Sequence, residues 1–197
     1  METPWAIIDD YVCKAYKTAK AALPNAKMYY NDYKHAATLG RYEAKSNSVF
    51  KLVKDLKDRN CGVDGVGFQS HVDLNYADEN YAAITGNIKR YAKLGVEVAF
   101  TEVDVRCNQF GNCELNDPWP YDQLIAQAEI YGKLLNVCLA EPSCKTFVTW
   151  GYSDYRSPFA SPQNALMQTK DFKEKPAYLK IMEILQNYTP ATLNTKE

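Results

Sequence analysis

Short apolar segments alternate along this chain with longer segments of helical periodicity, and this alternation constrains the fold more than any other feature. The strand-like segments, rich in β-branched and aromatic residues, cover residues 26–33, 64–72, 96–105 and 145–152. The helical segments cover residues 4–23, 46–62, 80–95, 120–140 and 175–188. Strands that alternate with helices run parallel and are joined by crossover helices. The sequence therefore predicts an α/β fold with a parallel sheet.

The first helical segment places its apolar side chains three or four residues apart. They are Trp5, Ile8, Val12, Ala15, Ala19 and Leu23. This spacing puts all of them on one face, and Pro24 follows as a stop signal. We expect one amphipathic helix from residue 4 to residue 23.

Length and charge limit the number of domains and the kinds of partner. With 197 residues, 46% of them hydrophobic, the chain can bury one core but is small for two, so we expect a single domain over residues 1–197. Its 23 basic and 24 acidic residues form no run of like charge, which argues against nucleic-acid and membrane partners. The 15 Tyr and 3 Trp residues suit sugar or peptide recognition as well as core packing.

Six cysteines indicate the compartment. Cys107 and Cys113 bracket a short turn-forming loop, as do Cys138 and Cys144, and neither pair has the spacing of a zinc or redox motif. Two local disulfides and a secreted, extracellular protein are therefore expected, with buried free thiols as the alternative. The partners of Cys13 and Cys61 stay open. The first residues lack the pattern of a signal peptide, so a signal has been removed or the parent chain begins earlier.

Each strand-like segment starts apolar and ends with polar or aromatic residues. These are Asn31, Asp32 and Tyr33; Gln69 and His71; Glu102 and Asp104; and Trp150 and Asp154. In parallel α/β sheets the ligand site lies beyond the carboxyl ends of the strands, so these side chains should meet at one rim. The strand ends recur every 30 to 50 residues or so, the size of a βα unit. Four such units make half of a closed (β/α)8 barrel, which typically needs about 250 residues.

The strand segments also carry a family resemblance. The motifs are YYNDY, GVGFQSH, VAFTEVDV and FVTWGYSD, in that order. They resemble the fifth to eighth strand motifs of the family 10 glycoside hydrolases, endo-β-1,4-xylanases with a TIM barrel. Further likeness lies in the helix before the first motif, in the disulfide loop VCLAEPSC and in the closing helix KDFKEKPAYLKI. The resemblance implies a partial catalytic domain over residues 1–197 that holds the last four βα units.

The resemblance assigns catalytic roles to three residues. Glu102 corresponds to the nucleophile, which forms a covalent glycosyl-enzyme intermediate and retains the configuration of the sugar. His71 and Asp104 correspond to a hydrogen-bonded relay that orients Glu102 and keeps it ionised. Such a relay is chemically sensible, because a positioned histidine held by a second carboxylate favours a charged nucleophile. No cofactor or metal is implied.

The resemblance also assigns substrate contacts. Gln69 matches the residue that bonds the 2-hydroxyl of the sugar at the cleavage point, and Asn31 and Tyr33 line the same pocket in relatives. Trp150 matches an aromatic platform beneath that sugar, where an indole can cover the apolar face of a pyranose. The substrate implied is xylan or a xylo-oligosaccharide. The preference for xylan over cellulose is inferred only from the usual substrate of the family.

Without the resemblance, each of these residues has a plainer explanation. Glu102 and Asp104 would be solvated carboxylates at a strand end, and His71 a structural histidine. Trp150 would be a core residue, and Gln69, Asn31 and Tyr33 would carry no functional signal. The functional interpretation depends on their joint position at successive strand ends together with the motif match.

Two features depart from the family pattern. A retaining glycosidase needs a second carboxylic acid to protonate the leaving oxygen, and the Asn-Glu motif that carries it in the family does not occur in this chain. Glu2 is a poor substitute, since it lies on the helix side of that motif. The second departure is the absence of a tryptophan a few residues after Asp154. The nearest replacements are Tyr155, Pro158 and Phe159.

A half barrel also has open strand edges, which invite pairing with another copy or with a complementary fragment. Three hypotheses follow. The chain is a fragment of a secreted xylanase, a half that becomes active with a partner chain supplying the acid, or a xylan-binding or structural descendant without turnover.

Overall fold

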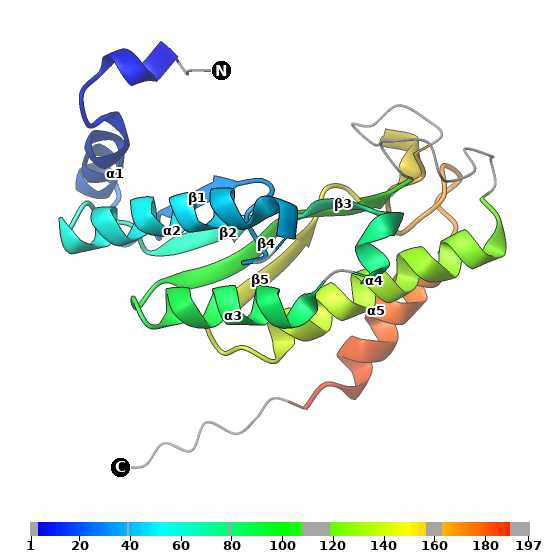
Figure 1. The fold of residues 1–197 in the computed structure, drawn as a ribbon. Helices are drawn as coiled ribbons and strands as arrows, with labels where there is room; N and C mark the ends of the chain where they lie inside the picture. The colour runs from blue at the N-terminus through cyan, green and yellow to red at the C-terminus, as the bar shows by residue number, and fades with distance from the viewer. Residues whose placement is uncertain (1–3, 39, 79, 108–118, 157–162, 190–197) are drawn as a thin grey trace.

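The computed structural model describes residues 4–38, 40–78, 80–107, 119–156 and 163–189 (Figure 1). Its strands are β1 (Tyr29–Asp32), β2 (Gly65–Phe68), β3 (His71–Asp73), β4 (Glu97–Arg106) and β5 (Cys144–Thr149). Its α-helices are α1 (Tyr11–Ala22), α2 (Glu43–Asp58), α3 (Tyr81–Ala92), α4 (Tyr121–Leu139) and α5 (Pro176–Asn187). Every strand pairing in this sheet is parallel, which confirms the predicted α/β class.

β4 is the long central strand of the sheet. β2 and β3 pair with its first and last parts, β1 pairs with β2, and β5 pairs with β4. Between β2 and β3, the N–H of Glu102 donates to the carbonyl of Gln69 at 3.1 Å, so both short strands follow one edge of β4. The expected single strand at residues 64–72 is thus interrupted at Gln69 and Ser70. Ser70 has a φ of 60°, a left-handed conformation that breaks regular pairing.

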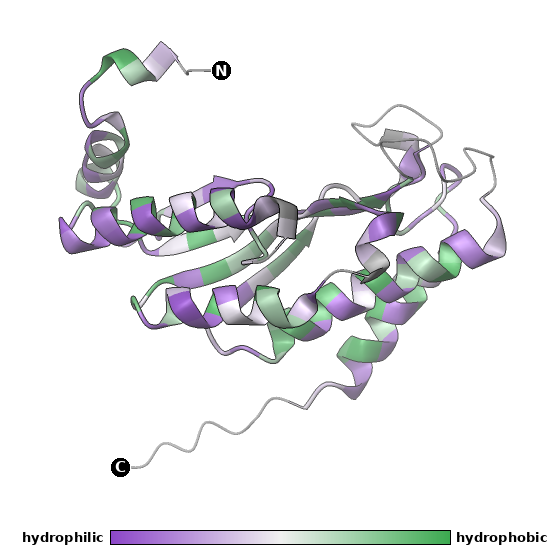
Figure 2. Cartoon of the chain, viewed as in Figure 1, coloured by the Kyte–Doolittle hydropathy of each residue, from purple (hydrophilic) through white to green (hydrophobic). Residues whose placement is uncertain are grey.

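The core lies between the sheet and the helices packed on it. β2 is buried along its whole length, and the hydropathy colouring shows the apolar character of the central strands (Figure 2). Fully buried residues from several elements make up this core: Val53, Ile84, Ile88, Phe100 and Leu134. Regular burial of each helix's apolar stripe explains why the 3.6-residue pattern in the sequence located α2, α3 and α4.

The expectation of one helix over residues 4–23 is wrong. A short 3-10 helix covers Pro4–Ile7, and α1 begins at Tyr11. Asp10 separates them with a φ of 54°, and its carboxylate is ion-paired with Arg59 at the end of α2. Aspartate tolerates this conformation better than most residues. Trp5, which the pattern placed on the apolar face of that helix, is 64% exposed.

Disulfides fix two of the loops. Cys138 and Cys144 are bonded, as the sequence predicted, and join the end of α4 to the start of β5. Cys13 and Cys61, which the sequence left without partners, form a second bond between α1 and the turn after α2. Cys107 is disulfide-bonded, and Cys113 lies outside the described residues.

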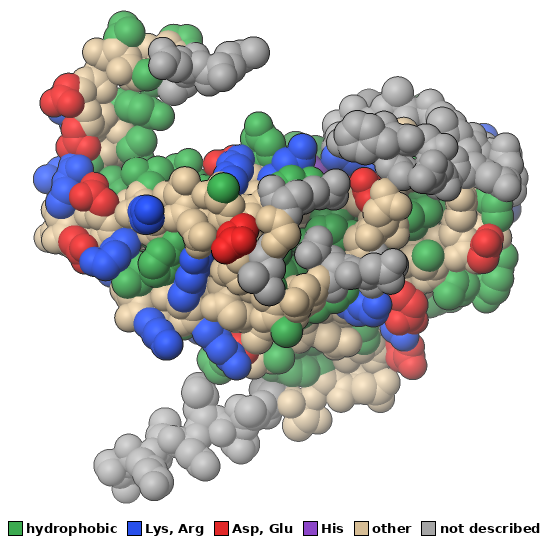
Figure 3. Space-filling model, in the orientation of Figure 1, with side chains coloured by type: hydrophobic (Ala, Val, Ile, Leu, Met, Phe, Trp, Pro, Cys, Tyr) green, Lys and Arg blue, Asp and Glu red, His purple; other side chains and the backbone are tan. Residues whose placement is uncertain are grey.

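The surface carries charges of both signs. Lys and Arg side chains are interspersed with Asp and Glu on the face shown in Figure 3. None of the helices in the described ranges combines the length and the apolar character that crossing a bilayer requires.

His35 links the tips of β1 and β2 from inside the core. It has no exposed surface, and its Nε2 donates to the carbonyls of Asp32 at 3.0 Å and Gly67 at 3.2 Å. Its Nδ1 is buried and has no hydrogen-bond partner in the described part of the chain. Burial lowers the pKa of His35 to about 4, because a proton on Nδ1 would place a charge in the core.

We therefore expect the chain to lose stability in mild acid through His35. Its folded-state pKa lies below the unfolded value, so the unfolded chain binds more protons as the pH falls from about 6.5 to 4. The free energy of unfolding should fall by about 2 to 3 kcal/mol over this range, as measured by urea denaturation. His35→Gln keeps an N–H donor and should flatten the profile, whereas His71→Gln should leave the acid loss in place. Equal acid losses in the native chain and His35→Gln would contradict this assignment.

Candidate active site

The carboxyl end of β4 carries two carboxylates on one face of the strand. Glu102 and Asp104 are two residues apart, so their side chains point the same way. Relative to β5, the register of β4 shifts between Phe100 and Val103, which places Glu102 in an irregular part of the strand. The Asp104 side chain is fully buried, and the Glu102 side chain is 14% exposed. Although both side chains lie on the same face, the Asp104 carboxylate is enclosed by the protein, whereas the Glu102 carboxylate reaches the surface at the rim.

Both oxygens of Glu102 have partners. Asn31 at the end of β1 donates from Nδ2 to Oε1 at 2.8 Å. His71 at the start of β3 places Nε2 3.1 Å from Oε2. On its other side, His71 Nδ1 is hydrogen-bonded to Oδ2 of Asp104, its register partner on β4. A carboxylate that accepts from two donors is held in one orientation.

The proton balance of His71 supports this arrangement. Burial by itself lowers the pKa of His71, but the hydrogen bond to Asp104 and the charges of Asp104 and Glu102 outweigh it and raise the pKa above the ordinary value. Burial also raises the pKa of Asp104, against the opposing effect of His71. Both shifts favour keeping a proton on this pair. The proton shared with Asp104 lies at Nδ1, whereas the Nε2 side of the ring faces Glu102.

Asn31 is oriented by its neighbours. The hydroxyl of Thr101 donates to Asn31 Oδ1 at 2.7 Å, so the amide nitrogen is the end that faces Glu102. Gly67 on β2 leaves the space for this amide, since a Cβ at position 67 would lie 2.4 Å from Asn31 Oδ1. Sequence reasoning missed Thr101 and Gly67. Their only signal was their position inside strand motifs that already carried candidate residues.

Trp150 directly follows β5, and its side chain contacts His71. The backbone N–H of Trp150 donates to the backbone carbonyl of Val103 at 3.0 Å, which fixes this part of the chain against β4. The indole meets the His71 ring edge-on at a centroid distance of 5.9 Å and is 41% exposed. An open aromatic face therefore lies next to the His71–Glu102 pair.

Gln69 and Tyr33 lie at the same rim but are less closely tied to Glu102. Gln69 is placed by its backbone, which bonds to Asp32 and Glu102. Tyr33 is half-exposed, and the Lys45 ammonium lies 3.6 Å from the centroid of its ring. The structure shows no contact between the Tyr33 side chain and Glu102 in the described residues.

Asp154 does not join the rim, contrary to expectation. Its carboxylate is nearly buried, receives the N–H of Leu166 at 2.9 Å and pairs with Lys175 at 3.1 Å. The chain turns after β5, so this side chain anchors the start of α5 instead. Tyr155 is exposed, while Glu2, Pro158 and Phe159 lie outside the described residues.

The chemistry available at the rim is that of a nucleophile or base. A carboxylate is held by an amide and by an imidazole that contacts a partly exposed indole. No group of three or more metal-ligating side chains was found in the part of the chain that the structure describes. Among the described side chains at the rim, those of Asn31, Gln69 and Trp150 cannot serve as a carboxylic acid. The Asp32 carboxylate at the tip of β1 is paired with Lys45 at 2.8 Å.

Comparison with known sequences identifies related enzymes. The sequence profile for "Glycosyl hydrolase family 10" matches residues 5–184. The chain is 35% identical over 190 residues to endo-1,4-beta-xylanase B of Neocallimastix patriciarum. This match covers 96% of the chain and 20% of that protein.

Solved structures show the same arrangement of strands and helices. Xylanase 10B from Thermotoga petrophila in complex with xylobiose matches with a TM-score of 0.81 and 35% identity, over 94% of this chain and 55% of that chain. The intracellular xylanase from Thermoanaerobacterium saccharolyticum matches with a TM-score of 0.76 and 30% identity, over 92% of this chain and 52% of that chain. The chain thus spans about half the length of these two structures.

Proposed function

Because this chain belongs to glycosyl hydrolase family 10, we propose that it provides the nucleophile half of a retaining endo-β-1,4-xylanase active site. The observation that carries the proposal is the Glu102 carboxylate, held by Asn31 and by the His71–Asp104 pair beside the open face of Trp150. Xylan is the proposed substrate, since the relatives reported above are xylanases and one of their structures contains xylobiose.

In the proposed reaction, Glu102 attacks the anomeric carbon of the sugar and forms a covalent intermediate that water then hydrolyses. The Asn31 and His71 donors hold the carboxylate in the orientation needed for this attack. Trp150 supports the apolar face of the sugar ring, and Gln69 bonds its 2-hydroxyl. The product keeps its β configuration because the sugar is displaced twice.

The leaving oxygen of xylan also needs a proton. In retaining enzymes the acid that donates it lies roughly 5 to 5.5 Å from the nucleophile. In our proposal this acid comes from outside the described residues, either from the same polypeptide or from a partner chain.

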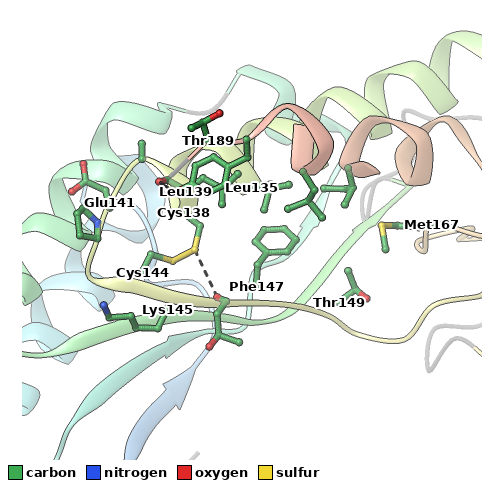
Figure 4. A pocket seen from close by; sticks show the side chains of 16 residues that line it. Leu135, Cys138, Leu139, Glu141, Cys144, Lys145, Phe147, Thr149, Met167 and Thr189 are labelled. Carbon is green, nitrogen blue, oxygen red and sulfur yellow. Dashed lines mark hydrogen bonds between the residues drawn. A yellow bond between two sulfur atoms is a disulfide. The ribbon is translucent and has the colours of Figure 1, made fainter. Parts of the chain in front are cut away.

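A second candidate function is a half barrel that works only with a partner. An open apolar groove of about 830 Å³ lies between α4, β5 and α5, with Leu135, Leu139, Phe147 and Met167 among its walls (Figure 4). Val148 on β5 is 45% exposed, although valine favours buried strands. Apolar surface of this kind favours association with a second copy or with a complementary half barrel. Light scattering behind size exclusion would show whether the chain associates.

The disulfides favour an extracytoplasmic location for the protein. The family does not decide this question, since one matched relative is an intracellular xylanase. We therefore propose secretion on the disulfides alone.

The nucleophile can be tested without the acid. Dinitrophenolate is a leaving group that departs without being protonated, so it does not need this acid. A 2-deoxy-2-fluoro-xylobioside that carries this group should therefore label the chain, and the covalent glycosyl-enzyme intermediate should accumulate. Mass spectrometry is expected to place one disaccharide on the peptide that contains Glu102. The matching cellobioside should label more slowly if xylan is the natural substrate. Labelling at another residue, or none at saturating probe, would refute the proposed function.

A further inference from the structure

One oxygen of Asp104 lies buried without a hydrogen-bond donor. Oδ2 is bonded to His71, but Oδ1 has no hydrogen-bond partner in the described residues, and the side chain is fully buried. Burying an ionised carboxylate with an unsatisfied oxygen is costly. Something nearby must offset that cost if Asp104 is to stay charged beside His71.

Arg106 is a permanently charged residue close to this oxygen. Its Nε lies 3.6 Å from Asp104 Oδ1, close enough for an ion pair but too long for a hydrogen bond. Arg106 ends β4 two residues after Asp104, so both side chains share a face of the strand. The Arg106 side chain is only 14% exposed, which limits the screening of its charge by water.

We propose that Arg106 is a positioning residue for the nucleophile, acting on Glu102 through Asp104 and His71. Its guanidinium keeps Asp104 ionised, ionised Asp104 keeps His71 protonated, and the protonated imidazole donates to Glu102 and holds its orientation. Charges of alternating sign thus run along the tips of β3 and β4. The catalytic consequence rests on the proposed function, whereas the electrostatic coupling stands on the geometry alone.

The other groups around Asp104 do not replace Arg106. His71 faces it from β3 and Glu102 from β4, and the buried Tyr131 faces it from α4. Asp73, the register partner of Arg106, adds a further acid to this region. Arg106 is therefore the one permanent cation that the described residues place within ion-pair distance of Asp104.

NMR titration of the Asp104 carboxyl group and the Arg106 guanidinium tests the electrostatic coupling between them. The measurement uses the intact chain and needs no sugar ligand. In the unsubstituted protein, the Arg106 Nε–H resonance should move with the same midpoint as the Asp104 carboxyl carbon. A resonance that does not respond to the Asp104 titration would overturn the proposal, and this result does not depend on any variant folding.

Substitutions give the second measurement. Arg106→Gln should raise the Asp104 midpoint by about one to three pH units, the usual effect of an opposite charge at this range. Arg106→Lys keeps the charge and should restore most of the shift, because the contact is not a shaped hydrogen bond. Arg59→Gln, which removes an exposed cation at the end of α2, is the control and should change nothing. An unchanged midpoint in Arg106→Gln would overturn the proposal, even if Glu102 is labelled as proposed above.

Discussion

Glu102→Gln is expected to slow the hydrolysis of dinitrophenyl β-xylobioside by at least about 10⁴-fold, the scale on which removing a nucleophile slows an enzyme. Glutamine keeps the size of the side chain and can still contact Asn31 and His71, so the fold should survive. It cannot form the glycosyl ester, because the amide is a far weaker nucleophile. Release of dinitrophenolate, followed by absorbance, measures the loss.

Glu97→Gln is the matched control for this prediction. Glu97 lies at the amino end of the same strand and is bonded to Lys27 and Tyr29, far from the strand tips. Removing an exposed ion pair there should change the rate by less than about twofold, since such pairs contribute little. Comparable losses in both variants would point to general damage. Full activity in Glu102→Gln would show that another group is the nucleophile.

The sequence predicted the parallel sheet and the gathering of strand-tip residues for a simple physical reason. Parallel strands end at one edge, and alternate residues share a face, so Glu102, Asp104 and His71 could be placed together from spacing alone. Their catalytic roles came from the family resemblance and remain proposals.

Features that depend on tertiary contacts were not predictable in this way. The Cys13–Cys61 bond depends on how α1 packs against the end of α2, which no local pattern records. The break at Ser70 and the turn at Asp10 are single-residue changes of backbone conformation inside otherwise regular patterns. Asp154 followed a strand like the other candidates, but buried Lys175 draws its carboxylate away from the rim.

The protonated state of His71 links this geometry to the pH dependence of the reaction. His71→Ala is expected to reduce turnover of the same substrate by roughly 10²- to 10³-fold, the range typical of groups that control a catalytic proton. The variant removes a donor to Glu102 and leaves Asp104 buried without its partner. Residual activity should remain, because Asn31 still holds the other oxygen of the nucleophile.

The shape of the pH profile distinguishes this role from simple destabilisation. Loss of the His71 proton at high pH removes the donor to Glu102, so it should give kcat/KM an alkaline limb that is missing in His71→Ala. In the native chain the imidazolium persists above the ordinary range, because Asp104 raises the pKa of His71. His35→Gln removes the other histidine and should leave the limb in place. A His71→Ala variant that is slower at every pH by the same factor, with the alkaline limb unchanged, would mean that His71 supports the fold and does not act as a protonated donor to the nucleophile.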